Sequence, residues 1–419
     1  MTDQYFENLK TALHKAGIST PTLVIDKQRL DHNIDQLMNV INQGFNYRIV
    51  AKSLPSVPLL QYIMHRTGTQ RLMSFHLPFL MHLVKQIPAA DILMGKPMPV
   101  SAAEHFYQWY SKQPANLCFF PEHQLQWLVD SNARLLQYQA LAERLQQPMR
   151  INLEIDIGLH RGGFASDDDY LDALNIIRNS SWLTFSGLMG YEAHIAKIPP
   201  FLGGPQKALQ QARQRYRDRV NMAKEVFGSE RSDEWCLNTG GSTTYPLYDA
   251  DDLTTVNELA TASALVKPTD FDLFTLDHHL PAVFIAAPVL KRVNKPELPM
   301  THWISSILRW LGRLPANAAF IYGGNWLASP CYPLPCRRAN VLGHSSNQEL
   351  YELPADCQLK EDDFIFFRPS QSESLFLQFG NIALCDDGRI HEWWPVFSYP
   401  RDFTVTDQTL TVPQAAANS

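Results

Sequence analysis

A lone lysine, Lys52, ends a short apolar run that contains β-branched residues, 48–52. Pro55 and Pro58 follow it, and from there the pattern is typical of a helix. In a strand-then-helix unit this places an amine at the carboxyl end of a strand, where α/β proteins hold their active sites. A lysine in that position can form a Schiff base with a carbonyl compound. Taken alone, Lys52 is more typical of a strand-end lysine that reaches solvent, so its chemistry depends on what the rest of the chain brings near it.

Two further apolar runs lead into polar side chains. Residues 154–164 cross a strand end into a glycine-flanked turn that carries Arg161, which could pair with a carboxylate or a cofactor, or simply with Asp156. Residues 187–194 end in Tyr191-Glu192-Ala193-His194, which adds a phenol, a carboxyl and an imidazole. A single histidine here is more often structural than functional. Tyrosine and histidine arriving together at the same rim as lysine and arginine favour a functional site.

The segment 238–244, Asn-Thr-Gly-Gly-Ser-Thr-Thr, is a candidate phosphate-binding turn. Two glycines let the backbone approach a phosphate closely, and the neighbouring hydroxyls can donate hydrogen bonds. A Gly-Gly-Ser turn by itself is a weak motif, so its position in the fold decides its meaning.

The elements that must position these residues are eight short apolar runs, most of them separated by amphipathic helical segments. The runs are 48–52, 71–75, 91–95, 116–120, 151–156, 184–189, 234–239 and 255–259. Strands that alternate with helices predict a parallel sheet, and eight such repeats predict a TIM-type (β/α)8 barrel. An open doubly wound sheet is the alternative, but no Gly-x-Gly-x-x-Gly fingerprint follows an early strand. In barrels a phosphate site often follows strands seven and eight, which is where residues 238–244 fall.

After about residue 270, apolar runs alternate with turn signals instead of helices. The runs are 282–293, 318–322, 349–353, 363–367, 376–384 and 389–396. Asp386-Asp387-Gly388-Arg389 is a strong hairpin signal between the last two. We therefore predict a barrel domain over 20–268, a mostly antiparallel β-domain built from 1–25 and 269–402, and a polar tail over 403–419.

Composition narrows the class of protein. The chain has 419 residues, 45% of them hydrophobic and 19% charged, which is typical of a globular enzyme. A net charge of −6 and a pI near 6.2 argue against nucleic acid or an anionic membrane as the partner. No apolar run is long enough to span a bilayer, and the N-terminus has no secretory pattern. Six scattered cysteines fit reduced thiols in a cytoplasm.

The order of these motifs resembles that of the fold-type III pyridoxal-phosphate enzymes. The motifs are Lys52, His160-Arg161-Gly162-Gly163, Tyr191-Glu192-Ala193-His194 and Thr239-Gly240-Gly241-Ser242-Thr243. The chain is most similar to the branch of D-serine dehydratase and D-threonine aldolase, which has an alanine-racemase-type barrel and a C-terminal β-domain. Residues 20–26 and 387–396 resemble the opening and closing segments of these enzymes, so the resemblance covers the chain from about 20 to 400.

The resemblance implies pyridoxal 5′-phosphate as the cofactor and a D-amino acid as the substrate. Lys52 would hold the cofactor as a Schiff base and then take the α-proton of the substrate. The groups that would bind the phosphate and flank the ring are Gly240, Gly241, Ser242, Thr243, Asn238, Arg161 and Tyr191, with His194 nearby. The resemblance also implies a homodimer, in which Tyr322 of the β-domain could line a substrate site. A plain turn at Tyr322 is at least as good an interpretation.

The sequence departs from this branch at its metal site. These enzymes carry a His-x-Cys pair that binds zinc about twenty residues before the closing segment. Gln371 and Glu373 stand at the matching positions. An amide and a carboxylate suit Mg²⁺, Mn²⁺ or Ca²⁺ better than zinc. The alternative is that no metal binds and that Glu373 acts as an acid towards a leaving hydroxyl.

The resemblance therefore predicts a lyase that dehydrates D-serine or D-threonine to a 2-oxo acid and ammonia. Retro-aldol cleavage of a D-threonine-like substrate and amino-acid racemisation are the enzymatic alternatives. A protein that binds the cofactor without catalysis is the non-enzymatic one. The predicted β-domain argues against it by fold-level analogy, because a mere carrier would not need that domain.

Overall fold

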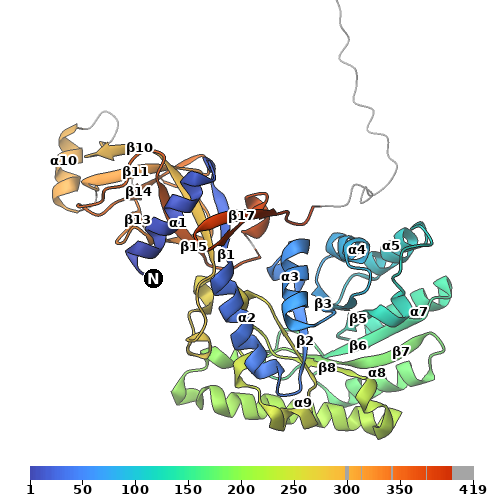
Figure 1. The fold of residues 1–419 in the computed structure, drawn as a ribbon. Helices are drawn as coiled ribbons and strands as arrows, with labels where there is room; N and C mark the ends of the chain where they lie inside the picture. The colour runs from blue at the N-terminus through green and yellow to red at the C-terminus, as the bar shows by residue number, and fades with distance from the viewer. Residues whose placement is uncertain (298–301, 313, 341–342, 374, 399–419) are drawn as a thin grey trace, which may run out of the picture.

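The computed structural model describes residues 1–297, 302–312, 314–340, 343–373 and 375–398. The predicted tail, 403–419, lies outside these residues. Figure 1 shows two units joined side by side, a barrel with its surrounding helices and a β-domain that includes the N-terminal helix α1 (Asp3–Lys15). No helix in the described part of the chain has the length and apolar character needed to cross a membrane.

Eight parallel strands close into a barrel in chain order, which confirms the predicted (β/α)8 architecture. The strands are β2 (Asn46–Val50), β3 (Arg71–Ser74), β4 (Asp91–Met94), β5 (Leu125–Val129), β6 (Met149–Ile155), β7 (Leu183–Gly190), β8 (Cys236–Thr239) and β9 (Glu258–Thr261). The main helices around them are α2 (Lys27–Ile41), α3 (Val57–Thr67), α4 (Leu77–Gln86), α5 (Val100–Tyr110), α7 (Asn132–Leu145), α8 (Asp167–Asn179) and α9 (Gly204–Phe227). Closure comes from β2 pairing with β9, so the carboxyl ends of all eight strands meet at one rim.

The prediction of the fourth barrel strand was wrong. The run 116–120 is not a strand, and the strand β5 begins at Leu125, after the short helix α6 (Pro121–Gln124). The run looked like a strand because it is apolar, but its Phe119 is buried within a loop. The carbonyl of Phe119 accepts a hydrogen bond from the Tyr110 hydroxyl. The true strand contains Gln126, which is fully buried and bonded to Asn152 inside the barrel.

The β-domain is a nine-stranded, mostly antiparallel sheet. Its strands are β1 (Thr22–Asp26), β10 (Val283–Asn294), β11 (Asn317–Tyr322), β12 (Ala328–Tyr332), β13 (Arg337–Arg338), β14 (Gln348–Glu352), β15 (Phe364–Pro369), β16 (Ile382–Asp386) and β17 (Arg389–Trp394). Strand β1 pairs with β10 and β16, so the N-terminus is part of this sheet. The predicted hairpin joins β16 to β17, with positive φ at both Asp387 and Gly388. The sequence did not predict β12, β13 or the helix α10 (His302–Trp310).

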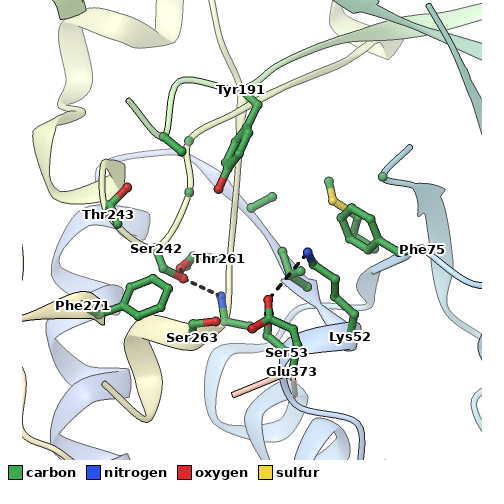
Figure 2. Close-up of a pocket in the computed structure, with 18 of the residues that line it drawn as sticks. Lys52, Ser53, Phe75, Tyr191, Ser242, Thr243, Thr261, Ser263, Phe271 and Glu373 are labelled. Atoms are coloured by element: carbon green, nitrogen blue, oxygen red, sulfur yellow. Dashed lines mark hydrogen bonds and ion pairs between the residues drawn. The ribbon is translucent and has the colours of Figure 1, made fainter. Parts of the chain in front are cut away.

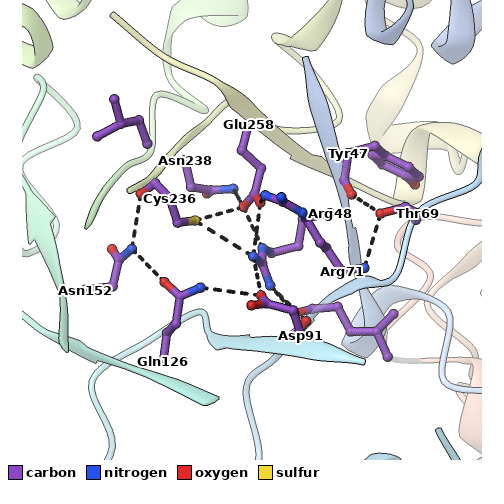
Figure 3. A network of polar contacts seen from close by, with 12 residues as sticks. Tyr47, Arg48, Thr69, Arg71, Asp91, Gln126, Asn152, Cys236, Asn238 and Glu258 are labelled. Carbon is purple, nitrogen blue, oxygen red and sulfur yellow. Dashed lines mark hydrogen bonds and ion pairs between the residues drawn. The ribbon is translucent and has the colours of Figure 1, made fainter. Parts of the chain in front are cut away.

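The inside of the barrel holds a buried charged network below the rim (Figure 3). Arg48 has no exposed side-chain surface and donates from Nε to Glu258 Oε1 at 2.5 Å and from Nη2 to Asp91 Oδ1 at 2.6 Å. Arg71 donates to the other oxygen of Glu258 at 2.8 Å. Asn238 donates its amide to Glu258 Oε1 at 2.8 Å, which ties strand β8 to the network. Burial raises the pKa of Glu258, but the charges of Arg48 and Arg71 outweigh it and lower that pKa to about 2.

Substituting Glu258 with Gln is expected to lower the free energy of unfolding by about 3 kcal/mol, because it removes the fully buried carboxylate partner of Arg48 and leaves only Asp91 to compensate the buried guanidinium. The ionised Glu258 contributes its full stability above the ordinary pKa of 4.5, and this contribution disappears as the pH falls through about 2. At neutral pH the substitution should therefore show its full destabilising effect. Equilibrium urea unfolding at pH 7 measures it. Glu104→Gln, which removes an exposed pair with Arg144, should cost less than about 1 kcal/mol. Equal effects of the two substitutions would contradict the prediction.

Candidate active site

A cavity of about 230 Å³ opens at the carboxyl ends of the barrel strands and is lined by residues of both units (Figure 2). Most of the predicted site residues line it. These are Lys52, Arg161, Tyr191, Asn238, Gly240, Gly241, Ser242, Thr243, Gln371 and Glu373. Val50, Met73, Met189 and Ala260 add apolar surface from four of the strands. The fold thus brings together side chains that are up to 321 positions apart in the chain, from Lys52 to Glu373.

Lys52 lies in a single 3-10 turn, Ala51–Ser53, that follows β2 directly. Its Nζ is 3.6 Å from Glu373 Oε1 and 4.5 Å from the centre of the Phe75 ring. The side chain is 41% exposed, so the amine is accessible from the cavity instead of being locked in the core. The structure thus places Lys52 at the mouth of the barrel, and its role as the Schiff-base lysine stays a prediction.

The loop 240–243 is shaped to receive an anion. Gly240 has a φ of +80°, and the backbone N–H groups of Thr244 and Tyr245 both donate to the carbonyl of Gly241, which closes a tight turn. The Thr243 hydroxyl is buried and has no hydrogen-bond partner in the described structure. A buried hydroxyl without a partner is costly, and a phosphate oxygen could accept a hydrogen bond from it. These residues fit the phosphate group that the sequence resemblance implies.

Tyr191 crosses the cavity beside this loop. A side chain placed on Gly241 would come within 2.8 Å of the Tyr191 ring, so only glycine allows the close approach. Arg161 also lines the cavity, and its guanidinium lies 5.0 Å from the centre of the Tyr191 ring. Burial raises the pKa of Tyr191, and the nearby Glu192 raises it further. The phenol is therefore protonated at neutral pH and can act as a hydrogen-bond donor.

Two predicted residues are placed outside the cavity lining. His194 packs near Gly158, its Nδ1 is buried without a partner among the described residues, and its pKa is lowered, mainly by burial. Tyr322 lies at the end of β11 in the β-domain and is 41% exposed. Neither side chain lines the cavity formed within one chain.

The two residues at the expected metal-ligand positions, Gln371 and Glu373, form hydrogen bonds with other side chains of the same chain. Glu373 Oε1 accepts from the Ser53 hydroxyl at 2.8 Å, and Gln371 Nε2 donates to Asp270 Oδ2 at 3.0 Å. Across the described residues, no group of three or more His, Cys, Asp or Glu side chains is arranged to hold a metal ion. The His-x-Cys pair of the zinc enzymes is therefore replaced here by an amide and a carboxylate that bond to Asp270 and Ser53.

The sequence analysis did not predict two residues that form hydrogen bonds with Glu373 and Gln371, namely Ser53 and Asp270. Ser53 is the direct neighbour of Lys52, so its place at the site could have been inferred from the strand end. Asp270 falls between the two domains, in a stretch with no strand or helix pattern, and only the folded chain brings it to Gln371.

Comparisons with known proteins agree with this architecture. Among curated proteins, none matches the sequence. Solved structures do match: D-threo-3-hydroxyaspartate dehydratase from Delftia sp. HT23 is 16% identical with a TM-score of 0.67, over 93% of this chain and 98% of that one. D-threonine aldolase from Filomicrobium marinum is 15% identical with a TM-score of 0.67, over 90% and 94%. Alanine racemase of Clostridium difficile 630 is 11% identical with a TM-score of 0.62, over 91% and 99%. At these identities the likeness concerns the fold.

The family assignment rests on a direct match of the sequence to a family model. The model is described as alanine racemase, N-terminal domain, and it matches residues 25–249, more than half of the chain. The matched stretch holds the barrel strands from β2 to β8 together with Lys52, Arg161, Tyr191 and the 240–243 loop. The chain therefore belongs to the family of the alanine racemase N-terminal domain.

Proposed function

We propose that this protein is a pyridoxal-phosphate-dependent lyase that acts on D-hydroxy amino acids. In its simplest form it dehydrates D-serine or D-threonine to a 2-oxo acid and ammonia. The observation that carries the proposal is the distance of 3.6 Å between Lys52 Nζ and Glu373 Oε1, in a cavity that also holds the 240–243 loop. An amine and a carboxyl side by side can serve the two neighbouring carbons of one small substrate.

The alanine-racemase-type fold implies pyridoxal phosphate, and the chain offers groups for each part of it. Gly241, Ser242 and Thr243 would bind the phosphate, while Arg161 and Tyr191 would flank the ring. When bound, the cofactor supplies an electron-withdrawing pyridine ring conjugated to the substrate amine, which acidifies the α-carbon. Lys52 Nζ would first hold the cofactor and then take the α-proton of the amino acid.

Glu373 would act on the β-hydroxyl. A substrate with its α-carbon beside Lys52 Nζ would have its β-carbon one bond away, and Glu373 Oε1 lies 3.6 Å from that amine. The carboxyl would give a proton to the departing hydroxide, which leaves as water. Hydrolysis of the released enamine then yields the 2-oxo acid and ammonia and consumes one water. The similarity in fold to a D-threo-3-hydroxyaspartate dehydratase and a D-threonine aldolase supports a β-hydroxylated D-amino acid as the substrate.

Retro-aldol cleavage is a second candidate, favoured by one observation. Glu373 lies in ion-pair distance of Lys52, and a carboxylate held in that pair can accept the β-hydroxyl proton instead of donating one. Cleavage of the bond between the α- and β-carbons would then give glycine and an aldehyde. The same two residues thus support either reaction, and the products distinguish them.

A product assay tests the proposal. Purified protein reconstituted with pyridoxal phosphate is incubated with D-serine, D-threonine and their L-forms, and 2-oxo acid, ammonia, glycine and aldehyde are measured. We expect 2-oxo acid and ammonia in equal amounts from a D-substrate and about 100-fold less from its L-form, which would place the α-proton on the wrong side of Lys52. Inversion at the α-carbon without any of these products would show a racemase. Tight cofactor binding without turnover of any substrate would show a cofactor-binding protein that is not an enzyme.

We further propose that the chain forms a homodimer in a reducing compartment such as the cytoplasm. All six cysteines are free, which fits that compartment. The family resemblance of the sequence supports the dimer, and light scattering at micromolar concentration tests it. Two copies would also bring a second β-domain near each cavity, which is the setting in which Tyr322 could reach a substrate.

A further inference from the structure

We infer that Glu192 is a positioning residue for the phosphate site, because its buried carboxylate holds the two ends of the 239–244 loop together. The inference rests on the proposed function, since it takes this loop to be the one that binds the cofactor's phosphate. The sequence motifs predict no specific role for Glu192 beyond a carboxyl group at the rim of the barrel. In the structure its side chain is fully buried and does not line the cavity.

The two carboxylate oxygens reach opposite ends of the loop. The hydroxyl of Thr239, the last residue of β8, donates to Glu192 Oε2 at 3.0 Å. The hydroxyl of Thr244, where the loop turns into the next 3-10 segment, donates to Glu192 Oε1 at 2.6 Å. One side chain therefore fixes the separation of the two residues that flank Gly240–Thr243.

Two further donors among the described residues reach this carboxylate. The N–H of Gly240 and the hydroxyl of Tyr248 also point to Glu192, and Tyr248 in turn lies 3.2 Å from the Thr239 hydroxyl. A carboxylate accepts hydrogen bonds only, so it matches such a set of donors, whereas an amide would turn an NH₂ group against some of them. Burial raises the pKa of Glu192, and the hydrogen bonds from Thr244, Thr239 and Gly240 oppose that increase.

No cation compensates this carboxylate within the described part of the chain, and hydroxyls and one N–H do so instead. A buried carboxyl group held only by hydrogen bonds is an expensive way to stabilise a core. Its contacts converge on a single loop, so its effect should appear in the shape of that loop. The preceding residue, Tyr191, packs against the loop, since a Cβ placed on Gly241 would lie 2.8 Å from its ring. The turn after β7 thus supports the phosphate loop with two successive side chains.

The expected consequence is a selective loss of affinity for phosphate. In a Glu192→Gln variant the loop keeps its sequence, but one of the two acceptor oxygens that hold its ends becomes an NH₂ group. The separation of Thr239 and Thr244 should change, and the loop should then hold a phosphate less well. Apo wild type and variant are titrated with pyridoxal 5′-phosphate and, separately, with pyridoxal, which lacks the phosphate, while the absorbance of the ligand is followed. We expect the dissociation constant for pyridoxal 5′-phosphate to rise about 10- to 100-fold, equivalent to one or two hydrogen bonds to a charged group. The constant for pyridoxal should change less than about 2-fold, within the range of ordinary surface effects.

Two further sets of variants serve as the control and as replacements for Glu192→Gln. Asp252→Asn removes another largely buried carboxylate of the same region, one that pairs with Arg213 and does not touch the loop, and it should leave both constants unchanged. Thr239→Val and Thr244→Val each remove one donor to Glu192 and serve if Glu192→Gln does not fold, with a smaller loss in the same direction.

The outcomes separate the inference from the function on which it rests. Parallel weakening for both ligands in Glu192→Gln, or no weakening for either, would overturn the positioning role while leaving the proposed function intact. Wild-type protein that binds neither ligand would overturn the proposed function and the inference with it. Weakening for the phosphorylated ligand alone supports both.

Discussion

Replacing Lys52 with alanine is expected to lower turnover of every D-hydroxy amino acid by about 10⁴-fold, the upper range for a positioned proton-transfer group. The amine has no substitute, because the other lysine that lines the cavity, Lys197, does not stand at a strand end. The same variant should lose its covalent link to pyridoxal phosphate. Borohydride treatment followed by mass measurement of the intact protein then shows an added pyridoxyl group in wild type and none in Lys52→Ala.

A matched control is Lys96→Ala. Lys96 is exposed and also follows a barrel strand, β4, but lies outside the cavity lining. It should keep both turnover and the added mass. If Lys52→Ala still gained the pyridoxyl mass, another amine would be the attachment site and the assignment of the cavity would fail. If it lost the mass but kept turnover, Lys52 would not be the group that takes the α-proton, because the cofactor can still bind without a covalent link to the protein.

The barrel and the place where the candidate site residues meet could be predicted because both depend on local patterns. Each parallel strand with both faces covered reads as a short apolar run, and each βα-unit places whatever follows the run at one shared rim. Lys52, Arg161, Tyr191 and the loop 240–243 all follow such runs, so the sequence predicted their meeting point without any tertiary information.

What could not be predicted depends on contacts between distant parts of the chain. Strand β5 was missed because Gln126 faces a polar barrel interior, which interrupts the apolar run expected of a buried strand. The role of Glu192 was missed because its partners, Thr239 and Thr244, come 47 and 52 residues later. The contact of Ser53 with Glu373 spans 320 residues and depends on how the β-domain sits on the barrel, which no local pattern encodes.

Replacing Glu373 with glutamine is expected to separate the two halves of the reaction. Formation of 2-oxo acid from D-serine should fall about 10³-fold, within the range attributed to a single general acid, because the amide cannot give a proton to the departing hydroxide. Exchange of the α-proton should persist, since that step belongs to Lys52 Nζ. Proton NMR in D₂O, with D-alanine as a substrate that has no β-hydroxyl, measures the exchange, and the release of 2-oxo acid measures elimination.

The contact geometry explains why this split is informative. Glu373 is held by the Ser53 hydroxyl at 2.8 Å and lies 3.6 Å from Lys52, so its charge could serve only to orient the lysine. In that case Glu373→Gln would slow exchange and elimination by the same factor. Asp272→Asn, which removes a partly exposed pair with Arg368 on the neighbouring 3-10 segment, should change neither rate. A selective loss of elimination would mean that the Glu373 carboxyl acts on the β-hydroxyl itself. Equal losses of exchange and elimination would mean that Glu373 only positions Lys52 and that another group donates the proton to the leaving hydroxide.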